Sequence, residues 1–155
     1  VTMHYVPVQH WSIRNGTDEN KSLWGAWIVE SKVSNNETRK IFFNGDTGYC
    51  EIFKDIGLRY GPIDVSFIPI GAYGDEITSP FLKNQHIDPS EAGTIAYELR
   101  SQKVIGMNWG TFAFTHEHIM GPKEELSKWV QTHASKVGFD IDWFMTMFHG
   151  ETRIF

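Results

Sequence analysis

Cysteine, clustered basic charge and long apolar runs are scarce in this sequence of 155 residues. The one cysteine, Cys50, excludes an internal disulfide framework and is typical of a reducing, intracellular compartment. The formal net charge is −5 and the basic residues form no cluster, which argues against nucleic acid as a partner. No apolar run approaches the roughly 20 residues that a membrane-spanning helix needs, and no targeting signal is readable.

Several familiar catalytic motifs are also absent. The chain has no Gly-x-Ser-x-Gly elbow, no phosphate-binding glycine loop and no cysteine pair for redox chemistry or structural zinc. Cys50 adjoins an expected helix start and lacks an obvious base, so we interpret it as a buried, unreactive thiol rather than a nucleophile.

The composition that is present fits one globular domain with a sizeable core. Hydrophobic residues make up 41% and charged residues 21% of the chain, while the aromatic share of 14% is high. Large side chains are therefore expected to line a core or a pocket.

Apolar patterning predicts strands first and then alternating helices and strands. The predicted strands cover 1–9, 23–29, a segment beginning at 41, 63–70 and 104–107, with a last apolar segment over 141–148. The predicted helices cover 51–60, 88–102 and 122–136. Asp88-Pro89-Ser90-Glu91 is a strong helix start, because it combines an N-cap, a proline at the first helical position and a capping glutamate. This order predicts an α/β fold, a mixed sheet with helices packed on one face.

Three predicted strands end in polar or glycine-rich turns. These turns are Gly45-Asp46, Gly71-Ala72-Tyr73 and Asn108-Trp109-Gly110. Since open α/β sheets place ligands at the carboxyl ends of their strands, one site at a shared sheet edge is the economical interpretation.

Asp46 and His10 are the candidate metal ligands. Asp46 follows the buried run Ile41-Phe42-Phe43 and is either a metal ligand or a turn-former. His10 also lies at the end of an element, and imidazole with carboxylate is a ligand set that hydrolytic zinc accepts.

The other histidines are scattered. His116-Glu117-His118 has His-x-His spacing but lies in loop-like sequence, so we interpret it as a polar loop. His133 lies on a helix stripe and is expected to be packed. His86 and His149 are candidates for contact either with a metal ligand or with a substrate.

Six collinear motifs resemble one protein family. They are 8–11 (VQHW), 23–27 (LWGAW), 43–50 (FNGDTGYC), 68–73 (IPIGAY), 85–89 (QHIDP) and 109–112 (WGTF). The family is the N-acylphosphatidylethanolamine-hydrolysing phospholipase D family, within the metallo-β-lactamase superfamily, and the similarity extends from His10 to His149-Gly150-Glu151.

The resemblance implies an αββα sandwich with a dinuclear zinc site. It implies cleavage of the phosphodiester of an N-acylated phospholipid at a membrane surface, releasing an N-acylethanolamine and phosphatidic acid. By position, His10 would ligate one zinc and Asp46 would bridge both, with Trp11, Tyr73 and His86 contacting the substrate. Zinc would lower the pKa of bound water to about 7 and neutralise phosphate charge in the transition state.

The chain departs from the family pattern at three places. The superfamily's His-x-His-x-Asp-His motif is absent, so residues 1–155 resemble the carboxyl-terminal half of the fold. Asn108 stands where the family has histidine, the last ligand of the second zinc, so one zinc or two are expected with ligands completed from elsewhere. The segment from Gly74 to Pro80 is longer than the family's and lacks its Arg-Trp.

A half sandwich would expose the apolar sheet face that the other half covers. The sequence therefore predicts a partner, which is either the missing amino-terminal half on another chain or a second copy in a homodimer. The fragment alone is expected to be inactive.

Two other functions remain open. A degenerate, inactive member could serve as a structural subunit, which Asn108 and the missing ligands favour, whereas intact His10 and Asp46 favour the enzyme. A superfamily hydrolase acting on another phosphodiester or on a lactone is the third possibility, since the fold does not fix the substrate.

Overall fold

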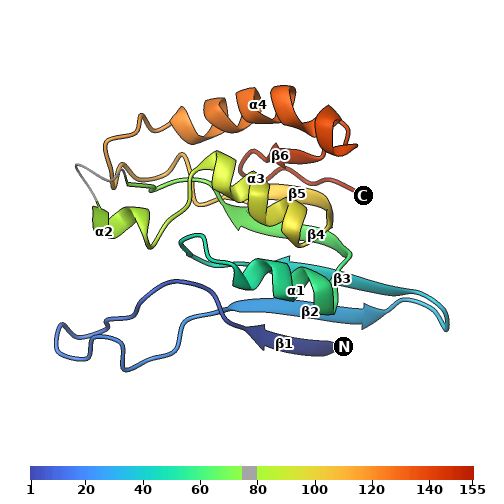
Figure 1. Cartoon of the computed structure of the whole chain (residues 1–155), viewed down its shortest axis with the longest axis horizontal. Coiled ribbons are helices and arrows are strands. Elements are labelled where there is room, and N and C mark those ends of the chain that lie inside the picture. Colours follow the sequence, from blue (N-terminus) through green and yellow to red (C-terminus); the bar gives the residue numbers. More distant parts are fainter. Residues whose placement is uncertain (75–79) are drawn as a thin grey trace.

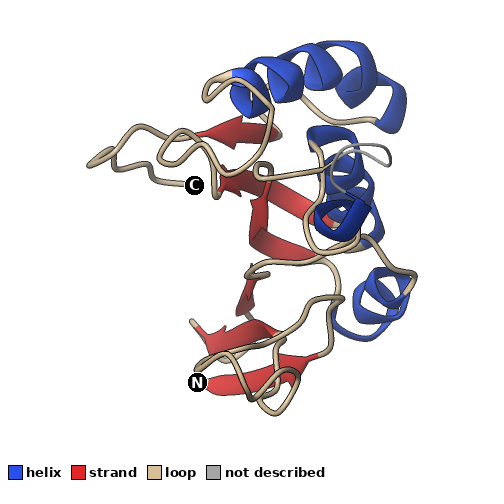
Figure 2. Ribbon diagram, turned by 90° about the vertical axis from the view of Figure 1, so that its left-hand side faces the viewer, coloured by secondary structure: helices blue, strands red, loops and turns tan. Residues whose placement is uncertain are grey.

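The described residues form a single six-stranded sheet with its helices on one side (Figures 1 and 2). The computed structural model describes residues 1–74 and 80–155. The strands are β1 (Thr2–Val6), β2 (Ala26–Lys32), β3 (Thr38–Phe43), β4 (Ile63–Pro69), β5 (Ser101–Met107) and β6 (Phe144–Thr146). The helices are α1 (Ile52–Tyr60), α2 (Pro80–Lys83), α3 (Pro89–Glu98) and α4 (Gly121–His133), which continues into the 3₁₀ turn η1 (Ala134–Val137).

The sheet is mixed and its strand order follows the chain, β1 to β6. β1, β2 and β3 pair antiparallel, as expected for a chain that opens with hairpins. β3, β4, β5 and β6 pair parallel, with helices in the crossover connections. The predicted α/β class, with a mixed sheet and helices on one face, is therefore confirmed.

The core lies between the sheet and the helices. One row of paired residues runs across the sheet on the helix side, and its members from β2 to β6 are buried. This inner row is Ile28, Phe42, Ser66, Val104 and Phe144. Phe53 of α1 and Ile95 of α3 are fully buried against it.

The opposite face of the sheet carries a second row of large apolar side chains. This outer row is Tyr5, Trp27, Phe43, Phe67, Ile105 and Met145, one from each strand. Trp27 and Phe43 are 40% and 48% exposed, whereas Ile105 is 7% exposed. No helix covers this face among the described residues, and Figure 2 shows loops and the carboxyl terminus, but no helix, on this side of the sheet.

The start of α3 confirms its predicted capping box. The Asp88 side chain accepts hydrogen bonds from the backbone N–H groups of Ser90 and Glu91, and the Glu91 carboxylate accepts one from the Asp88 N–H. The predicted end of this helix near residue 102 is wrong. α3 stops at Glu98, Arg100 adopts a positive φ of 55°, and Ser101 already begins β5.

None of the helices in the described ranges is long and apolar enough to cross a bilayer. Of the segment Gly74 to Pro80, residues 75–79 lie outside the described residues.

Candidate functional site

Asp46 lies at the carboxyl end of β3, on the turn that follows the last paired residue. The Asn44 N–H donates to the Phe67 carbonyl at 3.0 Å, which extends the pairing of β3 and β4 by one residue. Gly45 then adopts a φ of +70°, which a residue without a Cβ reaches without strain. The chain turns away and leaves the Asp46 side chain exposed at the sheet edge.

Hydrogen bonds bring His10 to the same turn. The Gln9 N–H donates to the buried Thr47 hydroxyl at 3.1 Å, and the Gly48 N–H donates to the Gln9 carbonyl at 2.7 Å. A Cβ on Gly48 would lie 2.1 Å from the Asn84 carbonyl oxygen, so only glycine fits there. The residues just before His10 are thus fastened to the residues just after Asp46.

The segment before α3 completes this part of the edge. His10 Nδ1 lies 3.1 Å from the Gln85 carbonyl oxygen, and the rings of His10 and His86 meet edge to face at 5.5 Å between centroids. Burial lowers the pKa of His86 and nearby His10 lowers it further, while the Asp46 carboxylate opposes this shift. Asp46, His10 and His86 therefore share one electrostatic environment.

Asn108 lies at the end of β5 and reaches the same carboxylate. Its Nδ2 donates to Asp46 Oδ1 at 2.7 Å, and its backbone has a positive φ of 57°. The structure thus joins the ends of β3 and β5 through one direct side-chain contact. The amide contacts Asp46 with its donor group, whereas a metal ligand must present a lone pair.

The predicted substrate-contacting residues separate into two places. Trp11 meets Phe81 edge to face at 5.1 Å, close to His10 in the chain. Tyr73 instead donates its hydroxyl proton to Glu125 Oε2 of α4 at 2.8 Å. Burial, and after it this hydrogen bond, raise the pKa of Tyr73. Its hydroxyl is therefore engaged on α4.

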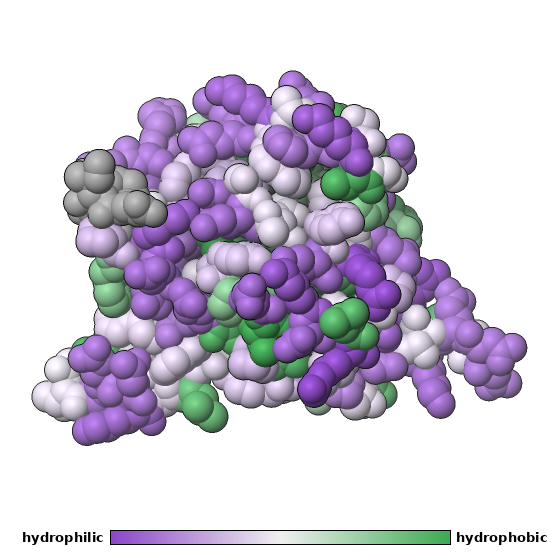
Figure 3. All heavy atoms as spheres, in the orientation of Figure 1, coloured by the Kyte–Doolittle hydropathy of each residue, from purple (hydrophilic) through white to green (hydrophobic). Residues whose placement is uncertain are grey.

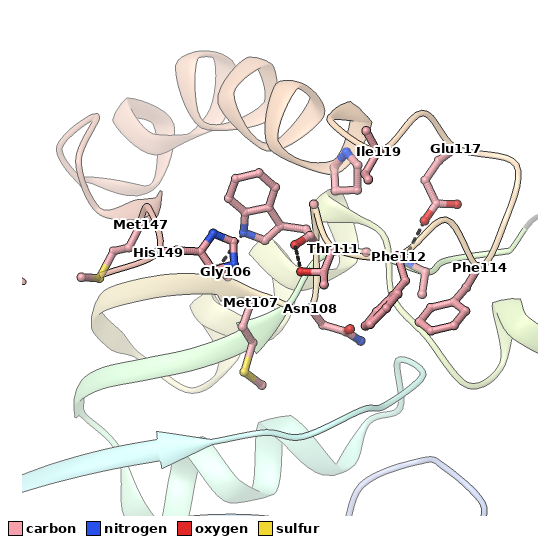
Figure 4. Close-up of a pocket in the computed structure, with 15 residues that line it drawn as sticks. Gly106, Met107, Asn108, Thr111, Phe112, Phe114, Glu117, Ile119, Met147 and His149 are labelled. Atoms are coloured by element: carbon pink, nitrogen blue, oxygen red, sulfur yellow. Dashed lines mark hydrogen bonds between the residues drawn. The ribbon is translucent and has the colours of Figure 1, made fainter. Parts of the chain in front are cut away.

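A cavity of about 350 Å³ opens beside Asn108 (Figure 4). Its wall includes Met107, Phe112, Phe114, Glu117 and His149, of which only His149 was singled out as a site candidate in the sequence. Glu117 lies in the segment interpreted as a polar loop, where His116 and His118 are indeed exposed. In the sequence, an acidic residue between two histidines was the feature that could have marked Glu117 as a site candidate.

Cys50 is half-buried rather than fully buried, and burial raises the pKa of its thiol. A raised pKa keeps the thiol protonated and unreactive. The expectation of an inert thiol therefore stays the better interpretation.

The side chains at this edge supply some, but not all, of the ligands that a metal ion needs. A carbonyl only accepts, so the His10 bond to Gln85 places the proton on Nδ1 and leaves Nε2 free to coordinate, the usual arrangement of a metal-binding histidine. Asp46 adds an exposed carboxylate. No group of three or more histidine, cysteine or acidic side chains arranged to hold a metal occurs among residues 1–74 and 80–155. A complete site needs ligands from beyond this set.

Comparison with known proteins bears on the family. The model of the Beta-lactamase superfamily domain matches residues 1–109. The chain is 38% identical over 130 residues to N-acyl-phosphatidylethanolamine-hydrolyzing phospholipase D 1 of Caenorhabditis elegans, covering 83% of the chain and 34% of that relative. It is 35% identical over 122 residues to the mitochondrial enzyme of the same description from Saccharomyces cerevisiae, covering 77% and 25%. The chain thus spans about a third or less of these relatives.

Solved structures show the same fold at low sequence identity. The structure of the metallo hydrolase Igni18 of Ignicoccus hospitalis is similar, with a TM-score of 0.59 at 18% identity. The match covers 94% of this chain and 48% of Igni18. An isothiocyanate hydrolase from Delia radicum gut bacteria matches 99% of this chain with 53% of its own, at a TM-score of 0.64 and 13% identity. The described fold corresponds to about half of each.

Proposed function

From the premise that this chain belongs to the β-lactamase superfamily, we propose that it acts in a metal-dependent phosphodiester hydrolase of the phospholipase D type. The proposed substrates are N-acylphosphatidylethanolamine-like lipids. The similarity to two proteins of that description supports this, at 38% and 35% identity over most of the chain. The observation that carries the proposal is the meeting of Asp46, His10 and Asn108 at one sheet edge.

His10 and Asp46 would hold the metal, proposed to be zinc. A bound metal of this kind supplies an activated water and neutralises developing phosphate charge. The chain's own residues orient the ligands. Gln85 fixes the His10 ring through Nδ1, and the Gly45 turn presents the carboxylate. His86, half-buried beside His10, would contact the substrate headgroup.

Exposed apolar side chains near this edge support peripheral contact with a lipid surface. Phe112 and Phe114 are 70% and 67% exposed at the cavity rim, and Phe81 is 52% exposed beside Trp11. Since the chain carries a net charge of −5, insertion of apolar side chains, rather than attraction to anionic lipid, is the proposed mode. Vesicle flotation with Phe112→Ser and Phe114→Ser tests this. Wild-type protein that does not bind vesicles containing N-acylated lipid would contradict it.

The outer row supports a partner for the open sheet face. The chain corresponds to about half of its structural relatives, so we propose that a second half of the sandwich, or failing that a second copy, covers this row. Light scattering of the chain, with and without Trp27→Glu and Phe43→Glu, reports association. Two charges on this face should abolish it, because each would be desolvated at the interface.

The activity is tested with the intact protein on N-acylphosphatidylethanolamine in mixed micelles, with both products followed by mass spectrometry. We expect hydrolysis that stops on chelation and returns with zinc. Asp46→Asn should lower the rate by about 100-fold or more, because it removes the charge that holds the metal. Asp55→Asn, which removes an exposed carboxylate from α1, is the matched control and should leave the rate unchanged. Hydrolysis that survives complete metal removal would exclude the proposal.

A structural, inactive subunit is the second candidate, and the bond from Asn108 to Asp46 favours it. That amide presents its donor group to the carboxylate and offers no lone pair to a metal there. Asn108→His separates the two candidates. If ligand loss limits the site, the substitution should raise both metal content and activity. If neither changes, the ligand-loss argument is wrong.

A further inference from the structure

The turns that follow β4 and β5 share an unusual backbone. Ala72, in the β4 turn (residues 71–73), has a φ of 62°, and Asn108, in the β5 turn (residues 108–110), has a φ of 57°. Residues with a Cβ adopt this left-handed conformation only at a cost in free energy. Two such residues side by side need surrounding contacts that hold them.

The two turns touch through their backbones. A Cβ on Gly71 would lie 2.3 Å from the Asn108 carbonyl oxygen, so no side chain separates them. Because closely packed backbone transmits displacement, a shift of the β4 turn moves Asn108. Asn108 in turn holds Asp46 through its amide at 2.7 Å.

Glu117, in the loop between β5 and α4, holds the β4 turn through a hydrogen bond. Its Oε1 accepts the Ala72 N–H at 2.7 Å, a charge-assisted hydrogen bond across 45 residues of sequence (Figure 4). Its Oε2 is buried and has no partner among the described residues. Glu117 forms part of the cavity wall, but its Oε1 is engaged by the Ala72 N–H, and its Oε2 is shielded from solvent at a cost in free energy because it is unpaired. The hydrogen bond between Glu117 and Ala72 therefore fixes the position of the β4 turn.

We propose that Glu117 is a positioning residue for the Asp46 edge, acting on Ala72, then on Asn108, and through the Asn108 amide on the carboxylate. This inference rests on the proposed function for its catalytic consequence, but its structural part is independent. It gives a role to a residue in a loop that carries no expected ligand. A substitution at Glu117 is therefore expected to loosen a site that it does not touch.

A second tether to the same turn supplies a control. Tyr73 donates to Glu125 of α4 at 2.8 Å, so acids from two places hold neighbouring residues of the β4 turn. Tyr73→Phe removes that bond and leaves the bond from Ala72 to Glu117 intact. It therefore tests whether any loosening of the turn has the effect, or only loss of the Glu117 contact.

The experiment compares the intact protein with Glu117→Gln and Glu117→Ala. Glutamine keeps a carbonyl acceptor at the same reach, whereas alanine keeps none. Hydrogen exchange should accelerate at least tenfold in Glu117→Ala at both the β4 and the β5 turn, with the segment of α3 unchanged. Glu117→Gln and Tyr73→Phe should stay close to wild type at the β5 turn. Zinc affinity, from chelator competition, should fall about tenfold in Glu117→Ala and recover in Glu117→Gln.

Unchanged exchange at residues 108–110 in Glu117→Ala would overturn the proposal, and so would a glutamine variant as impaired as alanine. Should Glu117→Ala fail to fold, Glu117→Asp, shorter by one methylene, is measured in its place. If wild-type protein binds no zinc or hydrolyses no lipid while exchange responds as expected, the proposed function fails and the positioning role stands. If the wild type is active and exchange does not respond, only the positioning role fails.

Discussion

The two faces of the sheet have the same apolar character and opposite surroundings. On the helix side, Phe42 is fully buried, whereas its neighbour Phe43, on the outer row, is 48% exposed. Seen from the helix side, the molecule presents mostly hydrophilic side chains, with apolar ones scattered among them (Figure 3). The helices thus convert one apolar face into a polar surface. The other face, apolar in every strand, has the pattern of a sheet built to be covered on both sides.

Phe42→Ala and Phe43→Ala break this comparison most strongly. Phe42→Ala should lower the free energy of unfolding by about 3 to 5 kcal/mol, because it leaves a cavity in the core. Phe43→Ala in the chain by itself should cost less than about 1 kcal/mol. Urea denaturation measures both. Equal costs in the chain alone would show that the outer row is already covered.

A buried hydroxyl pair tests the polar member of the inner row. The Ser66 and Ser101 hydroxyls lie 2.6 Å apart and are fully buried. Ser66→Ala should cost about 1 to 3 kcal/mol, since it strands the Ser101 hydroxyl without a side-chain partner. Replacing both serines by alanine should cost less than the single change. A double-mutant cycle by denaturation gives the coupling, and additive effects would contradict the pairing.

Tyr49 tests a polar link on the helix side. Its hydroxyl donates to Glu98 Oε1 of α3 at 2.8 Å. This hydrogen bond, the main cause, and burial, the second, raise the pKa of Tyr49 to about 12. A raised pKa means stabilisation that is complete below the unfolded value near 10 and is lost as pH rises toward 12. Tyr49→Phe should cost about 1 kcal/mol at pH 8 and flatten that decline. Thermal unfolding from pH 8 to 11 measures it, and an unchanged slope would count against the link.

A small effect is also expected at the cap of α3. Asp88→Ala should cost about 1 kcal/mol, because two N–H groups lose their acceptor. Asp88→Asn, which keeps a capping oxygen, is the control. Circular dichroism melts compare the two variants, and an alanine variant as stable as wild type would show that solvent satisfies these two N–H groups.

Local chemistry made much of this fold predictable. Asp88-Pro89-Ser90-Glu91 fixes a helix start by itself, and the helix predicted over 51–60 ends as expected at Tyr60, just before Gly61-Pro62. The end of α3 was not predictable in the same way. No glycine or proline marks it, and the chain leaves the helix because residues 101–107 pair with β4, a contact distant in the sequence.

The candidate site likewise has a part that the local sequence predicts and a part that depends on contacts distant in the sequence. Three turns at predicted strand ends predicted a shared edge, because parallel strands end together. These turns are Gly45-Asp46, Gly71-Ala72-Tyr73 and Asn108-Trp109-Gly110. The engagement of Tyr73 by Glu125 and the contact of Glu117 with Ala72 depend on how the loop before α4 folds back. Such contacts have no periodic signal, so only the structure reveals them. The metal and substrate roles assigned to these residues stay predictions.

The sequential strand order has a consequence for how the protein forms. Each strand pairs with the one made just before it, so no strand waits for a later one to be inserted between its neighbours. Growth of the sheet can therefore follow synthesis on the ribosome, with α1 and α3 closing over each pair of strands as it emerges. Carboxyl-terminal truncation would remove one edge strand at a time, starting with β6, and leave the hairpins of β1, β2 and β3 intact.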